Sequence, residues 1–83
     1  MNFRQMEIFY ELMVRGSVSA AASRLGISQP AASKIVHQLE REVGYDLFDR
    51  IRGRLCPTDQ ARALFKEVKH AYAALDAVNQ LER

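Results

Sequence analysis

Arginines stand at alternate positions in residues 49–58, the segment DRIRGRLCPT, where Arg50, Arg52 and Arg54 surround the single Gly53. The formal net charge of the whole chain is only +2, so the positive charge is concentrated locally. Guanidinium groups bind phosphates and carboxylates through paired hydrogen bonds. The segment is therefore either a basic turn in solvent or a contact for an anionic partner.

Polar side chains gather on one side of a helix expected over residues 29–43. At about 100° per residue, the apolar side chains fall within a narrow arc that faces the core: Ala32, Val36, Leu39 and Val43, with Ile35 at the edge. The residues on the opposite side include no acid. They are Pro30, Ser33, Lys34, His37, Gln38 and Arg41. Small polar side chains near a helix N-terminus reach base edges in DNA, and Lys and Arg reach phosphates. The alternative interpretation is an ordinary solvated helix face.

Patterns typical of enzymes and metal sites are missing from the sequence. It contains no nucleophile elbow, no phosphate-binding glycine loop and no pair of acids at catalytic spacing. His37 and His70 belong to different expected helices, and the single Cys56 has no partner at metal-ligand spacing. We therefore expect no enzyme activity, metal or cofactor in this chain. The lone cysteine and the lack of a long apolar run indicate a reduced, cytoplasmic setting and no membrane partner.

The first expected element is an amphipathic helix in the segment FRQMEIFYELMVRG. Its aromatic and methionine side chains recur every three or four residues and are interpreted as core: Phe3, Met6, Phe9, Tyr10 and Met13. Gly16 ends this helix, because glycine readily takes the left-handed conformation after a last helical turn.

Two further helices follow in close succession. Ser17 or Ser19 is placed to cap the first of them, and Gly26 ends it. Ser28 caps the next helix, and Pro30 lies in its first turn, where its missing N–H costs nothing. Two helices joined by so short a glycine-containing link are typical of a helix-turn-helix.

The arginine segment is predicted to form a small β-hairpin. Two strands of three or four residues flank a turn with Gly53 at its tip. Pro57 must lie at the end or edge of its strand, because it has no N–H to donate to the ladder.

The last element is a long helix over residues 59–83, capped by Thr58. Apolar residues along it follow heptad spacing and predict a dimer interface: Leu64, Val68, Ala71, Leu75 and Val78, with Phe65 and Tyr72 beside them. The helix is longer than a core of this size can cover, so its far half needs a partner. The sequence therefore divides into a DNA-contacting part, residues 1–58, and a dimerisation helix, residues 59–83.

The motifs SVSAAASRLGISQPAASKIVHQLE and GYDLFDR resemble the N-terminal domain of LysR-type bacterial transcription regulators. The resemblance covers the whole chain. It implies a mainly α winged helix-turn-helix, with three helices and a two-stranded wing, followed by a long linker helix. It also implies a dimer, or a higher oligomer, that binds a pseudo-palindromic operator in double-stranded DNA. The larger domain that binds a small-molecule effector in such regulators is expected outside this chain.

The resemblance also implies roles for individual residues. The major-groove set is Gln29, Pro30, Ser33, Lys34 and His37. Ser17, Ser19 and Arg50 are expected to hold phosphates, and a wing arginine, Arg52 or Arg54, is expected to enter the minor groove. Pro57 and the Gln60-Ala61 pair are shared with members similar to lysine-biosynthesis and opine regulators, which indicates an amino-acid-related operon.

Two other functions fit parts of the pattern. One is a protein-interaction module, for which the three wing arginines have no use. The other is an architectural protein that binds DNA without sequence preference, for which positive charge alone would suffice. The wing arginines therefore argue against the interaction module, and the polar face of residues 29–34 argues against the architectural protein.

Overall fold

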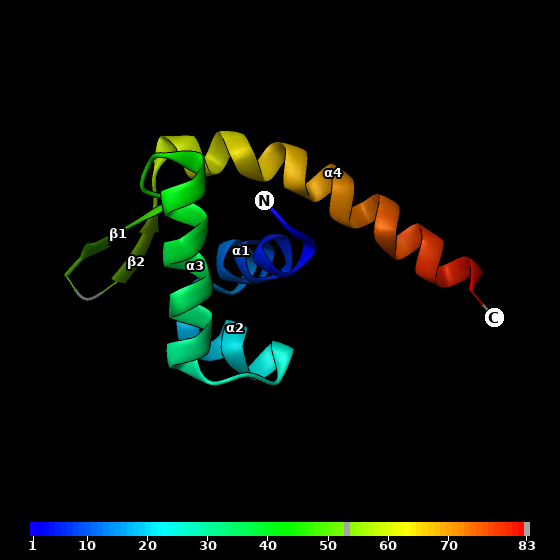
Figure 1. Cartoon of the computed structure of the whole chain (residues 1–83), viewed down its shortest axis with the longest axis horizontal. Helices are drawn as coiled ribbons and strands as arrows, with labels where there is room; N and C mark the ends of the chain where they lie inside the picture. Colours follow the sequence, from blue (N-terminus) through cyan, green and yellow to red (C-terminus); the bar gives the residue numbers. More distant parts are fainter. Residues whose placement is uncertain (53, 83) are drawn as a thin grey trace.

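The computed structural model describes residues 1–52 and 54–82, and this part of the chain forms four helices and two strands. In chain order these are α1 (Phe3–Arg15), α2 (Val18–Leu25), α3 (Gln29–Val43), β1 (Phe48–Ile51), β2 (Arg54–Pro57) and α4 (Asp59–Leu81). Figure 1 shows α1, α2 and α3 gathered together, the β1–β2 hairpin beside α3, and α4 crossing over α1 and α3. The predicted winged helix-turn-helix with a long final helix is confirmed.

The helix starts follow from polar caps that satisfy backbone N–H groups in the first turn. The Ser17 hydroxyl accepts a hydrogen bond from the N–H of Ala20 at 3.0 Å, so Ser17 rather than Ser19 caps α2. The Ser28 hydroxyl accepts one from the N–H of Ala31 at 3.2 Å at the start of α3. Gly26 ends α2 with a φ of 69°, in the left-handed region that glycine adopts at little cost. These local signals create the short link between α2 and α3.

Two packed clusters hold the elements together. One cluster joins the three N-terminal helices through buried side chains: Ile8, Leu12, Ala21, Ala22, Ala32 and Val36. The other joins α1, α3 and α4 to the residue before the wing: Phe9, Leu39, Leu47, Ala61 and Val68. Helix α1 lies between the two clusters and is therefore apolar over a wide arc.

The core face predicted for α1 is partly wrong, because α1 packs between two clusters. Phe3 is 49% exposed, because it lies in the first turn of α1, beyond both clusters. Met6, Tyr10 and Met13 are partly buried on the side that faces α4. The fully buried Ile8 belongs instead to the side that faces α2 and α3, which the predicted stripe omits.

The wing is a two-stranded antiparallel sheet. Its register pairs Phe48 with Pro57 at the base and Ile51 with Arg54 at the outer end. Pro57 is the last residue of β2, as its missing N–H requires. Gly53, predicted at the tip, lies outside the described residues.

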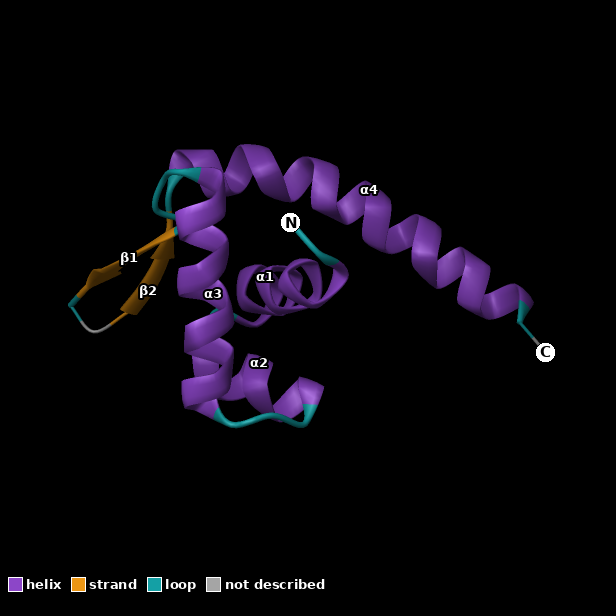
Figure 2. Ribbon diagram, viewed as in Figure 1, coloured by secondary structure: helices purple, strands orange, loops and turns teal. Residues whose placement is uncertain are grey.

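Helix α4 packs on the domain with its first half and projects beyond it with its second half (Figure 2). Val68 is 4% exposed and packs in the chain's own core, which leaves its side chain little surface for a partner. The predicted dimer seam remains a prediction, because heptad spacing does not distinguish contacts within a chain, such as those of Val68, from contacts between chains. Val78 is 53% exposed and Leu81 is 86% exposed. No described helix is both long and apolar enough to span a membrane.

Candidate nucleic-acid interface

The N-terminal half of α3 presents the polar side chains expected from the sequence. Gln29, Pro30, Lys34 and His37 are exposed, and Ser33 is half-buried. The opposite side of the helix is buried in the two clusters. Since α3 is held by packing on one side only, these polar groups are free to contact another molecule.

Residues from four elements line one concavity of about 510 Å³, among them Ser17, Ser19, Gln29, Arg50 and Arg54. They come from the start of α2, the start of α3 and both strands of the wing. Two guanidinium groups, two hydroxyl groups and the N-terminal end of α2 all favour an anion with several oxygen atoms. The concavity can therefore hold a phosphate group.

Arg52 lies in different surroundings from the other two wing arginines. It is exposed in the turn after β1 and has a φ of 53°, which is uncommon for a residue other than glycine. Arg52 directly follows Ile51, the last paired residue of β1, and a positive φ at the start of a hairpin turn matches the twist of the flanking strands. Arg52 is thus placed at the outer end of the wing.

A smaller hollow of about 210 Å³ lies between α3 and the wing, and Ser33, His37 and Arg50 line part of it. Arg50 borders both hollows and therefore joins the surface of α3 to that of the wing. Pro30 and Lys34 are exposed on α3, and neither of them lines these two hollows.

The ion pairs of the described part of the chain involve none of the side chains that line these two hollows. They join Arg4 to Glu7, Arg15 to Glu11, Arg62 to Asp59 and the N-terminal amine to Glu42. Within residues 1–52 and 54–82, Lys34 and the three wing arginines have no ion-pair partner. Their positive charges are therefore not neutralised internally, and they can attract an anion.

Glu40 of α3 holds the start of the wing. Its carboxylate accepts hydrogen bonds from the backbone N–H of Leu47 at 2.7 Å and of Phe48 at 3.4 Å. Leu47 is completely buried, so its N–H depends on this carboxylate rather than on water. Sequence reasoning missed this role, because the partner lies across a turn and no periodicity marks it.

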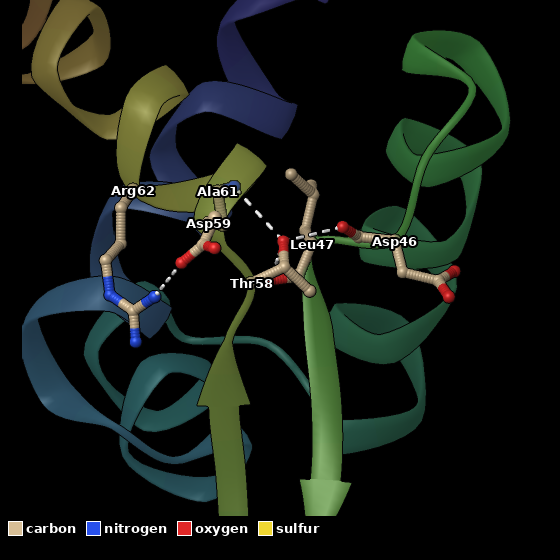
Figure 3. Close-up of polar contacts among 6 residues, drawn as sticks. All are labelled: Asp46, Leu47, Thr58, Asp59, Ala61 and Arg62. Carbon is tan, nitrogen blue, oxygen red and sulfur yellow. Dashed lines mark hydrogen bonds and ion pairs between the residues drawn. The ribbon is translucent and has the colours of Figure 1, made fainter.

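Thr58 joins the base of the wing to α4 (Figure 3). Its hydroxyl donates to the carbonyl oxygen of Asp46 at 2.7 Å and accepts from the N–H of Ala61 at 3.1 Å. Its own N–H donates to the carbonyl oxygen of Leu47 at 2.9 Å. The cap predicted from the sequence therefore also ties the start of α4 to the base of the wing, which the sequence does not reveal.

Comparison of the chain with known protein families supports this arrangement of three helices, a wing and a final helix. Residues 3–62 match the model of the bacterial regulatory helix-turn-helix proteins of the lysR family. The chain belongs to the LysR family. This membership confirms the resemblance seen in the sequence motifs.

Individual LysR-family proteins are similar over nearly the whole chain. The transcriptional regulator AdmX of Serratia plymuthica is 44% identical over 81 residues, which are 98% of this chain and 27% of AdmX. The probable transcriptional regulator PA0477 of Pseudomonas aeruginosa has a TM-score of 0.94 at 30% identity, over 100% of this chain and 28% of PA0477. Full-length CbnR in complex with its target DNA has a TM-score of 0.84 at 26% identity, over 100% of this chain and 29% of CbnR. The chain thus spans between a quarter and a third of the length of these relatives.

Proposed function

We propose that this chain binds double-stranded DNA as the sequence-specific DNA-binding part of a LysR-type transcription regulator. The observation that carries the proposal is the meeting of Arg50, Arg54 and Gln29 in one concavity at the junction of α2, α3 and the wing. The arginines have no ion-pair partner among the described residues, so their charge is available to DNA phosphates.

In this proposal α3 enters the major groove, which has the width of an α-helix. Gln29 and Ser33 hydrogen-bond base edges, and Pro30 makes apolar contact with the groove. Lys34 and His37 lie further along the same exposed side and reach bases or phosphates. The exposure of this face and the burial of the opposite face support the assignment.

The wing arginines take two different roles in the proposal. Arg50 and Arg54 hold a phosphate together with Ser17 and Ser19, because all four line the same concavity. Arg52 enters the minor groove, where a narrow A·T-rich sequence attracts a guanidinium group. Its place in the outer turn supports this choice over Arg54, which the sequence alone leaves equal.

Residues 1–58 contact DNA in this proposal, and residues 59–83 pair two copies. The surface available for pairing lies in the second half of α4, where Ala71 and Val78 are exposed and Leu75 is half-buried. Leu64 contributes at the edge of the core, and Tyr72 contributes the part of its ring that Tyr10 leaves uncovered. A symmetric dimer presents two copies of α3 to a pseudo-palindromic operator.

The remaining parts of the proposal concern the longer regulators that this chain resembles. A small-molecule effector would be sensed by parts of the regulator outside this chain, and an amino-acid-related compound is the class that the sequence favours. The regulator would act in the bacterial cytoplasm, where the DNA lies.

Selection of bound duplexes from a random pool tests the proposal. We expect enrichment of a pseudo-palindrome whose half-sites lie about one helical turn apart or a multiple of it. Binding without enrichment would instead indicate an architectural protein, and no binding at low salt would indicate a protein-interaction module. Either result would overturn the proposal.

A further inference from the structure

Five aromatic rings form a continuous row from the wing to α4. Between ring centroids, Phe48 of β1 lies 6.0 Å from Phe9 of α1, and Phe9 lies 6.3 Å from Phe65 of α4. Phe65 lies 5.8 Å from Tyr10, and Tyr10 stacks on Tyr72 at 4.0 Å with an angle of 2° between the ring planes. The row thus connects the base of the wing, α1 and α4 through four successive contacts.

The Tyr10–Tyr72 stack lies at the outer end of the aromatic row, between α1 and α4. Before it along α4, Phe65 and Val68 pack in the core. Beyond Tyr72, every described residue except the half-buried Leu75 is exposed. The mostly exposed half of α4 therefore begins next to this stack.

The phenol of Tyr72 is uncharged at physiological pH, as that of an ordinary tyrosine is, and its surroundings widen this margin. Burial raises the pKa of Tyr72 above its ordinary value of 10.0, the negative charges of Glu11 and Glu7 and the neighbouring Tyr10 raise it further, and Arg24 offsets part of the effect. An uncharged ring can remain stacked without recruiting a hydration shell, so the stack persists across the physiological pH range.

We propose that the Tyr10–Tyr72 stack sets the direction of α4 and thereby the separation of the two half-sites that a dimer of this chain accepts. The inference rests on the proposed function. From Tyr72 to Leu81 the helix extends about 14 Å, so a tilt of about 20° at the stack moves its end by about 5 Å. Such a shift exceeds the rise of about 3.4 Å per base pair and would move two paired domains out of register with a fixed operator.

The test varies the spacer between two selected half-sites by up to about four base pairs in either direction. The unmodified chain should prefer one spacing about tenfold over spacers two base pairs longer or shorter. Tyr10→Ala removes the stack without touching the exposed half of α4, and it should reduce this preference to about threefold or less. Its affinity for an isolated half-site should stay within about twofold, because Tyr10 lies outside the face that contacts DNA.

Tyr10→Phe is the matched control, because it keeps the ring and should keep the spacing preference. If circular dichroism shows that Tyr10→Ala does not fold, Tyr10→Leu replaces it, since leucine retains apolar volume but cannot stack. A Tyr10→Ala or Tyr10→Leu variant that folds and keeps the tenfold preference would overturn the inference alone. Failure of the unmodified chain to enrich any two-half-site operator would overturn the proposed function instead.

Discussion

Arg52 and Arg54 are two positions apart in the wing, but their surroundings differ. Arg52 is exposed in the turn after β1, and Arg54 lines the concavity shared with α2 and α3. Replacing Arg52 with Gln should remove a preference for A·T pairs under the wing, because an amide lacks the charge that a narrow minor groove attracts. Replacing Arg54 with Gln should weaken binding to all sequences alike, because Arg54 lines the phosphate concavity. Affinities for operators with A·T or G·C pairs flanking the half-sites separate the two effects. Base dependence lost in Arg54→Gln and kept in Arg52→Gln would reverse the assignment.

Glu40 illustrates a role that depends on one long-range contact. Glu40→Ala removes the acceptor for the buried N–H of Leu47, so we expect the free energy of unfolding to fall by about 1–3 kcal/mol. Urea unfolding measures this loss. Glu67→Ala, at an exposed position of α4, should change stability by less than about 0.5 kcal/mol. Equal, small losses in both variants would mean that water replaces the Glu40 carboxylate.

At the level of elements, the sequence predicts what neighbouring residues determine. Gly16, Gly26, Ser28 and Thr58 mark helix ends because the capping groups lie within a few residues of the backbone groups they satisfy. The same reasoning could not assign Phe3, which has the right type and spacing but lies beyond the packed clusters. Burial depends on which elements meet, and spacing along one helix does not contain that information.

The apolar seam predicted on α4 shows that spacing along a helix also fails to identify which residues are free for a dimer interface. Its apolar spacing continues without a break from Leu64 to Val78, although the chain itself covers Val68 and leaves Val78 half exposed at 53%. Along α4, the change from buried to exposed apolar side chains falls near the Tyr10–Tyr72 stack. It is therefore a property of the folded chain.

This division predicts which substitutions separate two copies. Leu75→Glu or Val78→Glu should raise the dimer dissociation constant by about tenfold or more, because a charge would be buried between apolar helix faces. Folding should be preserved, since neither residue belongs to the two buried clusters. Sedimentation equilibrium measures the dimer, and Gln80→Glu, on the opposite side of the same turns, should leave it intact. A dimer that survives both seam variants would place the interface elsewhere.

In the molecule as a whole, the cluster of cations beside α3 and the projecting half of α4 lie at opposite ends of the long axis (Figure 1). The chain measures 44 × 26 × 20 Å, and its long axis follows α4 away from the group formed by α2, α3 and the wing (Figure 1). Lys34 and the wing arginines have no ion-pair partner in the described residues and gather beside α3; Lys66 and Lys69 of α4 are also unpaired there, whereas Arg62 at the start of α4 is paired with Asp59. One end of the molecule is therefore suited to a polyanion, and the other end is suited to a second copy.

The salt dependence of binding tests this division of charge. Each phosphate contact releases counterions, so Arg50→Gln should reduce the slope of log K against log salt by about 0.9 for each bound copy. Gln29→Ala should instead leave the slope unchanged while costing about 1–3 kcal/mol on the selected operator and little on random DNA. Arg62→Gln is the control cation, because Arg62 is already paired at 2.8 Å with Asp59, and it should change neither quantity. A slope that falls equally in Arg50→Gln and Arg62→Gln would mean that overall charge attracts DNA without a defined phosphate site.

A Gln29→Ala variant equally weakened on both kinds of DNA would remove α3 from base recognition, because loss of a base contact must depend on the base.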